Sequence, residues 1–250
     1  MEYQDINAQV IDRWVEEGWE WGTPISHECF MNAKNGQWDV LLTPTKPVPH
    51  SWFGDLKGRQ ILGLASGGGQ QMPIFSALGA NCTVLDYSQK QLDSEATVAK
   101  REGYSIRVIR GDMTKPLPFL DSEFDLIFHP VSNCYVEKVE PIFRECFRVL
   151  KPGGILLCGL GNEINYLVDE EETVILHTMP FNPLLTPTHL QLLEKEDCGM
   201  QFSHTIEEQL GGQLKAGFLL TDLYGDTNGT GRLREMNIET YYATRAIKPL

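Results

Sequence analysis

The sequence predicts an α/β fold in which a mostly parallel sheet carries helices on both faces. Short apolar runs alternate with helical patterns between residues 58 and 160, and such alternation is typical of a parallel sheet. Three consecutive glycines, Gly67 to Gly69, separate the first apolar run from the helical pattern after it. The chain ends on two apolar runs joined by a polar turn, which predicts a terminal pair of strands.

Each predicted strand is a short apolar run bounded by glycine, proline or polar residues. The seven runs lie at residues 61–64, 83–86, 106–109, 124–128, 155–160, 218–224 and 240–247. Helices are predicted at residues 1–17, 70–78, 89–102 and 139–150, with a last one beginning at Thr205. Ser88 and Thr205 each open a capping box. The pair Gly211-Gly212 costs helix stability, and we expect it to allow close packing against the sheet.

The glycine triplet is the first candidate for a binding site. Glycine has no Cβ, so this loop can adopt positive φ and lie against a ligand. A strand that turns through it into a helix presents backbone N–H groups to a nucleotide-like or carboxylate-bearing ligand. Asp86 lies 19 positions after Gly67, where an acid can bind both ribose hydroxyls of an adenosine. A tight turn without a ligand is the alternative interpretation.

We expect a single domain over residues 1–250, divided into four segments. These are an N-terminal helix and aromatic cap (1–55), a cofactor-binding core (56–160), an inserted lid (161–204) and a C-terminal helix with a strand pair (205–250). Residues 19–55 are predicted to be irregular, and they either cover a ligand or pack against the core edge. Trp14, Trp21, Asn162 and His177 are candidate substrate contacts, with a surface excursion as the alternative for the lid residues.

The loop after the fourth predicted strand is the expected approach for a substrate. Ligands of open α/β sheets bind beyond the carboxyl ends of the strands. His129, Asn133 and Tyr135 are the polar groups of this loop. Each is expected to be a hydrogen-bonding wall residue more often than a proton carrier.

Composition narrows the class of partner. The net charge is −13, from 21 basic and 34 acidic residues, so nucleic acid and anionic membranes are disfavoured as partners. The six cysteines contain no Cys-x-x-Cys pair, and no metal site is expected. No signal-peptide pattern and no bilayer-length apolar run is present, so we expect a cytoplasmic protein. The sequence leaves the oligomeric state open.

Five motifs occur in one order along the core: Leu64 to Gly69, Leu85 to Ser88, Gly111 to Met113, Phe124 to Phe128, and Arg148 to Gly154. With these motifs the chain resembles class I S-adenosylmethionine-dependent methyltransferases, and it is similar to their "methyltransferase type 11" branch. The resemblance covers about residues 58–160. It implies a Rossmann-like sheet of seven strands with an antiparallel last strand.

The resemblance also implies roles for individual residues. The backbone at Ala65, Ser66, Gly67 and Gly69 would line the methionine and ribose end of S-adenosylmethionine. Asp86 would bind the ribose hydroxyls, and Tyr87, beside Ser88, would cover one face of the adenine. Asp112 would accept from the adenine amino group, and the Met113 backbone N–H would donate to the ring. His129 would sit beside the sulfonium and methyl group.

The chain departs from this family's pattern at two positions. The family usually has an acid where Gly63 stands and a glycine where Ala65 stands. Another residue, from the N-terminal segment for example, would have to replace the acid that orders the loop. We expect Ala65 to have an ordinary negative φ, as at the end of a strand.

The expected reaction is in-line methyl transfer from S-adenosylmethionine to a small, neutral or cationic acceptor, which leaves S-adenosylhomocysteine. His129 is the candidate base if the acceptor is a hydroxyl or a protonated amine. An NAD(P)-dependent oxidoreductase is one alternative, although Met72 stands where its fingerprint needs a third glycine. A non-catalytic protein that binds S-adenosylmethionine or S-adenosylhomocysteine is the other.

Overall fold

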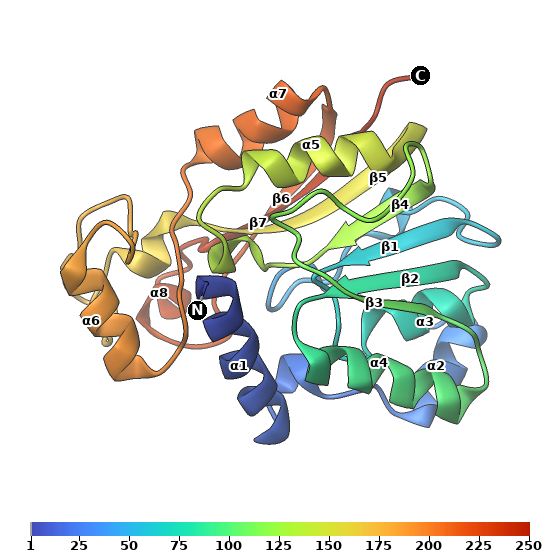
Figure 1. Cartoon of the computed structure of the whole chain (residues 1–250), viewed down its shortest axis with the longest axis horizontal. Coiled ribbons are helices and arrows are strands. Elements are labelled where there is room, and N and C mark those ends of the chain that lie inside the picture. The colour runs from blue at the N-terminus through green and yellow to red at the C-terminus, as the bar shows by residue number, and fades with distance from the viewer. Residues whose placement is uncertain (1) are drawn as a thin grey trace.

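The computed structural model describes residues 2–250 and contains a seven-stranded sheet with helices on both faces (Figure 1). The strand order is β3-β2-β1-β4-β5-β7-β6. The first five strands are parallel, and β7 runs antiparallel to both of its neighbours. The strands are β1 (Gln60–Leu64), β2 (Asn81–Asp86), β3 (Arg107–Arg110), β4 (Phe124–His129), β5 (Leu150–Gly161), β6 (Leu219–Asp226) and β7 (Tyr241–Ile247). The predicted fold class is confirmed.

The structure contains the predicted helices and three that the sequence analysis did not predict, at residues 27–34, 187–196 and 232–235. The first of these three lies in the stretch predicted to be irregular. The helices are α1 (Tyr3–Glu16), α2 (His27–Lys34), α3 (Gln71–Ala77), α4 (Gln89–Glu102), α5 (Glu140–Val149), α6 (Pro187–Glu196), α7 (Gly212–Ala216) and α8 (Arg232–Glu235). The helix α2 corrects that prediction, since it forms within residues 19–55. The Ser26 side chain caps it by accepting a hydrogen bond from the Cys29 N–H at 3.1 Å.

Two hydrophobic cores lie on the two faces of the sheet. Alternate residues of one strand point to opposite faces, so Ile61 enters one core while its neighbour Leu62 enters the other. The α5 side includes Phe143, and the α3 side includes Phe75. This burial on both faces explains why the central strands read as continuous apolar runs.

Gly212, the second of the paired glycines, packs against a helix and not against the sheet. A Cβ added at Gly212 would lie 2.9 Å from the ring of Phe143 in α5. A turn of π-helix, Glu207–Gly211, precedes α7. The predicted close approach is therefore present, but its partner is α5, which corrects the expectation.

The N-terminal helix and the inserted segment meet beyond the carboxyl ends of the strands. Figure 1 shows α1 and α6 on this side of the sheet. The Asn7 side chain of α1 donates to the carbonyl of Tyr135 at 3.1 Å and pairs with both backbone groups of Met200. Asn7 thus joins α1, the loop after β4 and the end of the insertion. Within residues 2–250 no helix is long and apolar enough to cross a bilayer.

Candidate functional site

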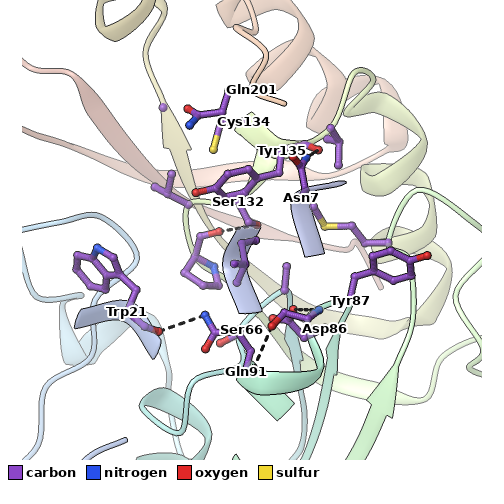
Figure 2. A pocket seen from close by; sticks show the side chains of 18 of the residues that line it. Asn7, Trp21, Ser66, Asp86, Tyr87, Gln91, Ser132, Cys134, Tyr135 and Gln201 are labelled. Atoms are coloured by element: carbon purple, nitrogen blue, oxygen red, sulfur yellow. Dashed lines mark hydrogen bonds between the residues drawn. The ribbon is translucent and has the colours of Figure 1, made fainter. Parts of the chain in front are cut away.

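A cavity of about 440 Å³ lies at the carboxyl ends of the strands, between the sheet, α1 and the insertion. Residues of the glycine loop and of the ends of β2 and β3 line what we call its strand half: Ala65, Ser66, Gly67, Asp86, Tyr87, Ser88, Gln91, Asp112 and Met113. What we call its cap half is lined by Val131, Cys134, Tyr135, Tyr166, Val168, His177, Phe181, Leu192, Leu193, Glu196, Gln201 and Tyr241. Figure 2 shows labelled residues of both halves around the cavity.

Asp86 holds the glycine loop in place from the end of β2. Its Oδ2 accepts a hydrogen bond from the Gly67 N–H, and its Oδ1 accepts one from the Ser88 N–H, both at 3.0 Å. Burial raises the pKa of Asp86 to about 6, against the lowering effect of these bonds. These two bonds leave other lone pairs of the carboxylate free for a ligand.

Glu95 is a loop-ordering residue that the sequence analysis missed. It comes from α4, is fully buried, and accepts a hydrogen bond from the Gly69 N–H at 2.9 Å. Burial raises the pKa of Glu95 to about 8. Its spacing in the sequence could have indicated that it is buried, because Leu92, Glu95 and Val98 recur every three residues on the buried face of α4.

The structure explains why an acid is missing at position 63. A Cβ at Gly63 would lie 2.9 Å from the sulfur of Met72, so the Met72 side chain fills the space that a carboxylate would need. The carboxyl group that bonds to the loop comes instead from Glu95 in α4.

The N-terminal segment also packs on the glycine loop, although it supplies backbone groups there and the acid comes from Glu95 of α4. The side-chain amide of Gln70 donates to the carbonyl of Glu20 at 2.7 Å, and the Ile25 N–H donates to the carbonyl of Gly69 at 2.9 Å. A Cβ at Gly68 would lie 2.5 Å from the carbonyl oxygen of Trp21. Position 68 therefore requires glycine for close approach as well as for its φ of 95°.

Ala65 corrects the expectation of an ordinary φ. Its φ is 47°, in the left-handed region, which costs an L-residue roughly 1–2 kcal/mol relative to glycine. The family's preference for glycine at this position follows from this conformation. The chain keeps the same loop shape with a strained alanine.

The other predicted strand-half residues are tied to α1 or to their own turn. The Tyr87 hydroxyl donates to Asp5 in α1 at 2.9 Å. Ser88 accepts from the Gln91 N–H at 3.1 Å, which caps α4. The Asp112 carboxylate accepts from the backbone and hydroxyl of Thr114, at 2.8 and 2.7 Å. All three residues line the cavity, together with Met113.

His129 lies behind the cavity and not in its lining. It is fully buried, with Nδ1 2.8 Å from the Leu64 carbonyl and Nε2 2.8 Å from the Asn133 amide oxygen. Burial lowers the pKa of His129, so the ring is neutral and carries one N–H, which Nδ1 must donate to the carbonyl. The nitrogen of the Asn133 amide has no other partner, and a half-turn of that amide lets it donate to Nε2. Both ring nitrogens are thus engaged within the protein.

Four more predicted site residues lie outside the lining. Gly69 acts through its backbone bonds to Glu95 and Ile25. Trp14 packs on Trp19, with ring centroids 5.2 Å apart. Asn133 pairs with His129, and Asn162 caps a short helical turn by accepting from Ile164. By contrast, Trp21, Tyr135 and His177 do line the cavity.

The strand half has the chemistry of an adenosine site without a diphosphate. Asp86, Asp112 and the ring of Tyr87 line it, and none of the residues around the whole cavity is Lys or Arg. A diphosphate needs free loop N–H groups, whereas the N–H groups of Gly67 and Gly69 already donate to the carboxyl groups of Asp86 and Glu95. Carboxylates suit ribose hydroxyls, an adenine amino group and a cationic sulfonium. The residues present therefore fit S-adenosylmethionine and disfavour a dinucleotide.

Comparison with known proteins agrees with this assignment. A sequence model described as a methyltransferase domain matches residues 62–158. An uncharacterized methyltransferase, YbaJ of Bacillus subtilis, is 41% identical over 250 residues, which is 97% of each chain. A sterol 24-C-methyltransferase of Aspergillus fumigatus is 28% identical over 138 residues, 54% of this chain and 36% of the relative.

The fold is shared with solved methyltransferases. An S-adenosylmethionine-dependent methyltransferase from Mesorhizobium loti superposes with a TM-score of 0.59 at 20% identity, covering 79% of this chain and 94% of the other. The strand order, the geometry of the strand half and these relatives lead to one conclusion. The chain belongs to the class I S-adenosylmethionine-dependent methyltransferases.

Proposed function

We propose that this methyltransferase transfers the methyl group of S-adenosylmethionine to a small-molecule acceptor inside the cavity. The observation that carries the proposal is the continuity of the two halves: one space of about 440 Å³ runs from Asp86 and Asp112 to the residues of the insertion. The helix α1 and the insertion cover this space. A cavity of this size, covered by α1 and the insertion, suits a small molecule. The distant sterol methyltransferase acts, by its name, on a small molecule as well.

In this proposal the strand half binds the cofactor as the family resemblance implies. Asp86 accepts from the ribose hydroxyls while it keeps its bonds to the loop. Tyr87 covers the adenine, and Asp112 and the Met113 backbone hold its edge. The backbone from Ala65 to Gly67 lines the methionine end. The bound cofactor supplies the activated methyl group, and the protein aligns the acceptor with it.

We assign His129 a positioning role in place of the expected role of base. Its ring connects the end of β1, through Leu64, to the loop after β4, through Asn133. A base must reach the proton that it removes, and this ring has no free nitrogen and no surface in the cavity. An acceptor that is already nucleophilic needs no base for transfer from a sulfonium.

The test of this proposal is the destination of the methyl group. The protein is incubated with S-adenosylmethionine labelled in the methyl group and with a cell extract, which is then separated into small molecules, protein and nucleic acid. We expect label in the small-molecule fraction and its loss with the Asp86→Ala variant. Label from the wild-type protein that appears only in the protein or nucleic-acid fraction would contradict a small-molecule acceptor.

A further inference from the structure

The cap half of the cavity has a composition that defines a class of acceptor. We propose that the acceptor is an uncharged, largely apolar molecule with one hydrogen-bonding oxygen, which the hydroxyl of Tyr135 anchors. This inference rests on the proposed function and adds the acceptor's chemistry to it. Three observations carry it: the charges around the cavity, the partners of its tyrosines, and the apolar side chains of the insertion.

The charges exclude an anionic acceptor. No Lys or Arg lines the cavity, and the carboxylates of Asp86 and Asp112 lie in its strand half. A buried carboxylate or phosphate without a partner costs several kcal/mol. A cationic reacting group is disfavoured as well, because it would lie beside the cationic sulfonium. Glu196 is the remaining carboxylate of the lining, but its side chain is exposed at the rim.

Tyr135 presents a hydroxyl without a protein partner. Three tyrosines line the cap half. The Tyr166 hydroxyl donates to the Gln201 side chain at 3.1 Å. The Tyr135 hydroxyl has no hydrogen-bonding partner within residues 2–250. Burial raises its pKa well above the ordinary value, so the group stays protonated and can donate.

The backbone around Tyr135 is held firmly, so its side chain is a preorganised anchor. The Tyr135 carbonyl accepts from Asn7 at 3.1 Å, and the carbonyl of its neighbour Cys134 accepts from the Phe202 N–H at 2.8 Å. The His204 ring lies 2.9 Å from the carbonyls of Asn133 and Val136. Preorganised donors lose little entropy when a ligand binds. Figure 2 shows Tyr135 between Asn7 and Ser132 at the cavity.

The insertion supplies an apolar approach to this anchor. Val168, Phe181 and Leu193 of the insertion line the cavity. Next to the lining residue His177 in sequence, Ile175 and Leu176 are 73% and 62% exposed. Exposed apolar groups beside a pocket are typical of a binding surface for an apolar ligand. A neutral apolar acceptor would lose little hydration free energy on this path.

The experiment uses three probes that differ in one group. Calorimetry of the full chain saturated with S-adenosylhomocysteine compares 4-propylphenol, propylbenzene and 4-propylbenzoate. We expect 4-propylphenol to bind most tightly, and the benzoate at least about tenfold more weakly because its charge is unpaired. In Tyr135→Phe, affinity for the phenol falls about tenfold, while affinity for propylbenzene and for S-adenosylhomocysteine stays unchanged. Tyr224→Phe, a matched change outside the cavity lining, leaves all affinities unchanged.

The outcomes separate this inference from the proposed function. Tighter binding of the benzoate, absence of phenol binding to the cofactor-saturated chain, or an equal loss for phenol and propylbenzene in Tyr135→Phe would each overturn the inference. Absence of S-adenosylhomocysteine binding would instead overturn the cofactor assignment on which it rests. If Tyr135→Phe does not fold, the wild-type ranking of the three probes still decides the question.

Discussion

The two halves of the cavity differ in how they use polar groups. In the strand half, carboxylates of Asp86 and Glu95 are already bonded to the glycine loop. In the cap half, apolar and aromatic side chains predominate, its one carboxylate (Glu196) is exposed, and the Tyr135 hydroxyl has no hydrogen-bonding partner within residues 2–250. The polar groups that shape the strand half are therefore bonded before a ligand binds, whereas the Tyr135 hydroxyl in the cap half is left for a ligand to bond. Such a division suits an enzyme with a fixed cofactor and a separately evolved acceptor site.

The halves also differ in origin along the chain. The strand half comes from one continuous stretch of the chain. Its residues meet because β1, β2 and β3 end side by side. The cap half collects residues from the loop after β4, from the insertion and from β7. The largest effect is expected from removal of the Asp86 carboxylate in the strand half, and the smallest from removal of the Ala65 side chain.

The largest expected effect is that of Asp86→Ala on cofactor binding. The change removes the ribose acceptor and frees the N–H groups of Gly67 and Ser88. Each of the two hydrogen bonds from the ribose hydroxyls to this charged group contributes about 1.5–3 kcal/mol, so affinity for S-adenosylhomocysteine should fall at least about 100-fold. The shift in melting temperature with added S-adenosylhomocysteine measures this loss. An undiminished shift would show that Asp86 does not contact the cofactor.

The next effect is that of His129→Ala on stability. The change leaves the Leu64 carbonyl and the Asn133 amide buried without partners, and each such group costs about 1–3 kcal/mol. We expect the free energy of unfolding in urea to fall by about 2–4 kcal/mol. If His129 has only a positioning role, the pH dependence of turnover keeps its shape in folded variant protein. A new requirement for higher pH, without loss of stability, would restore His129 as the base.

A further effect on stability is expected from pH acting through Glu95. The pKa of Glu95 is raised from 4.5 to about 8 by burial, and Asp86, Cys82 and Tyr104 are the titratable groups that interact with it. Between these two values the folded state holds a proton that the unfolded state has lost. The contribution of Glu95 to stability is therefore present at low pH and falls as pH rises toward 8.

The Glu95→Gln variant isolates this contribution, because the amide oxygen can still accept from Gly69. We expect the free energy of unfolding of Glu95→Gln to increase relative to that of wild type as pH rises from 5 to 8. Urea unfolding at several pH values measures the difference. A difference that stays constant over this range would mean that the pKa of Glu95 is not raised. Glu95→Ala, which removes the acceptor, should weaken S-adenosylhomocysteine binding, while Glu95→Gln retains it.

The smallest effect is that of Ala65→Gly. Glycine removes the strain of a positive φ, which costs roughly 1–2 kcal/mol. It also raises the entropy of the unfolded chain, which lowers the stability by about 0.4–1 kcal/mol. A net gain of between about 0 and about 1.6 kcal/mol in the free energy of unfolding is expected. A loss of stability would mean that the left-handed conformation at this position carries no strain.

The fold and the strand half were predictable because their signals are local. The glycine triplet, Asp86 and Asp112 each lie at the end of an apolar run, and parallel strands bring those ends together. The capping pattern at Ser88 fixed the start of α4 correctly. The left-handed Ala65 was not predictable, because the sequence of a loop does not state its φ.

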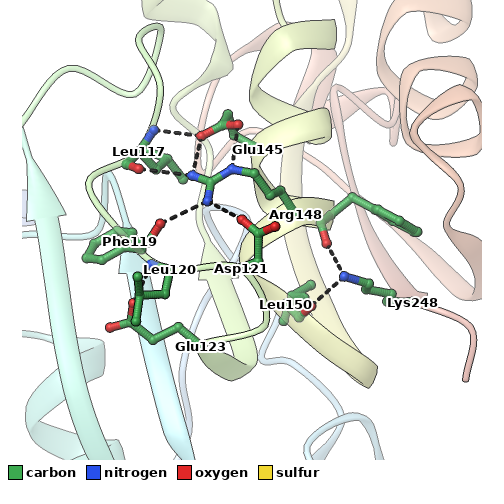
Figure 3. Close-up of polar contacts among 10 residues, drawn as sticks. Leu117, Phe119, Leu120, Asp121, Glu123, Glu145, Arg148, Leu150 and Lys248 are labelled. Atoms are coloured by element: carbon green, nitrogen blue, oxygen red, sulfur yellow. Dashed lines mark hydrogen bonds and ion pairs between the residues drawn. The ribbon is translucent and has the colours of Figure 1, made fainter.

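The cap half and the framework residues depend on contacts between distant segments. Nothing near His129 in sequence indicates that Leu64 would occupy one ring nitrogen. Arg148 is similar: Figure 3 shows it holding Glu145, Asp121 and the carbonyls of Leu117 and Phe119 at the base of the sheet. The sequence places Arg148 in a family motif, but it does not show that this side chain donates to the Leu117 carbonyl, 31 positions away. Asn7, which joins three segments, carried no sequence signal at all.

The most direct test of the account is calorimetric titration of the wild-type chain with S-adenosylmethionine, S-adenosylhomocysteine and NADH. The central claim is that the strand half is prebuilt for an S-adenosyl cofactor, because the N–H groups of Gly67 and Gly69 already donate to Asp86 and Glu95 and are not available to a diphosphate. We expect the first two compounds to bind with micromolar affinity and NADH to give no heat of binding. Binding of NADH alone would contradict the account, since it would require the bonds of Gly67 and Gly69 to Asp86 and Glu95 to give way to a diphosphate.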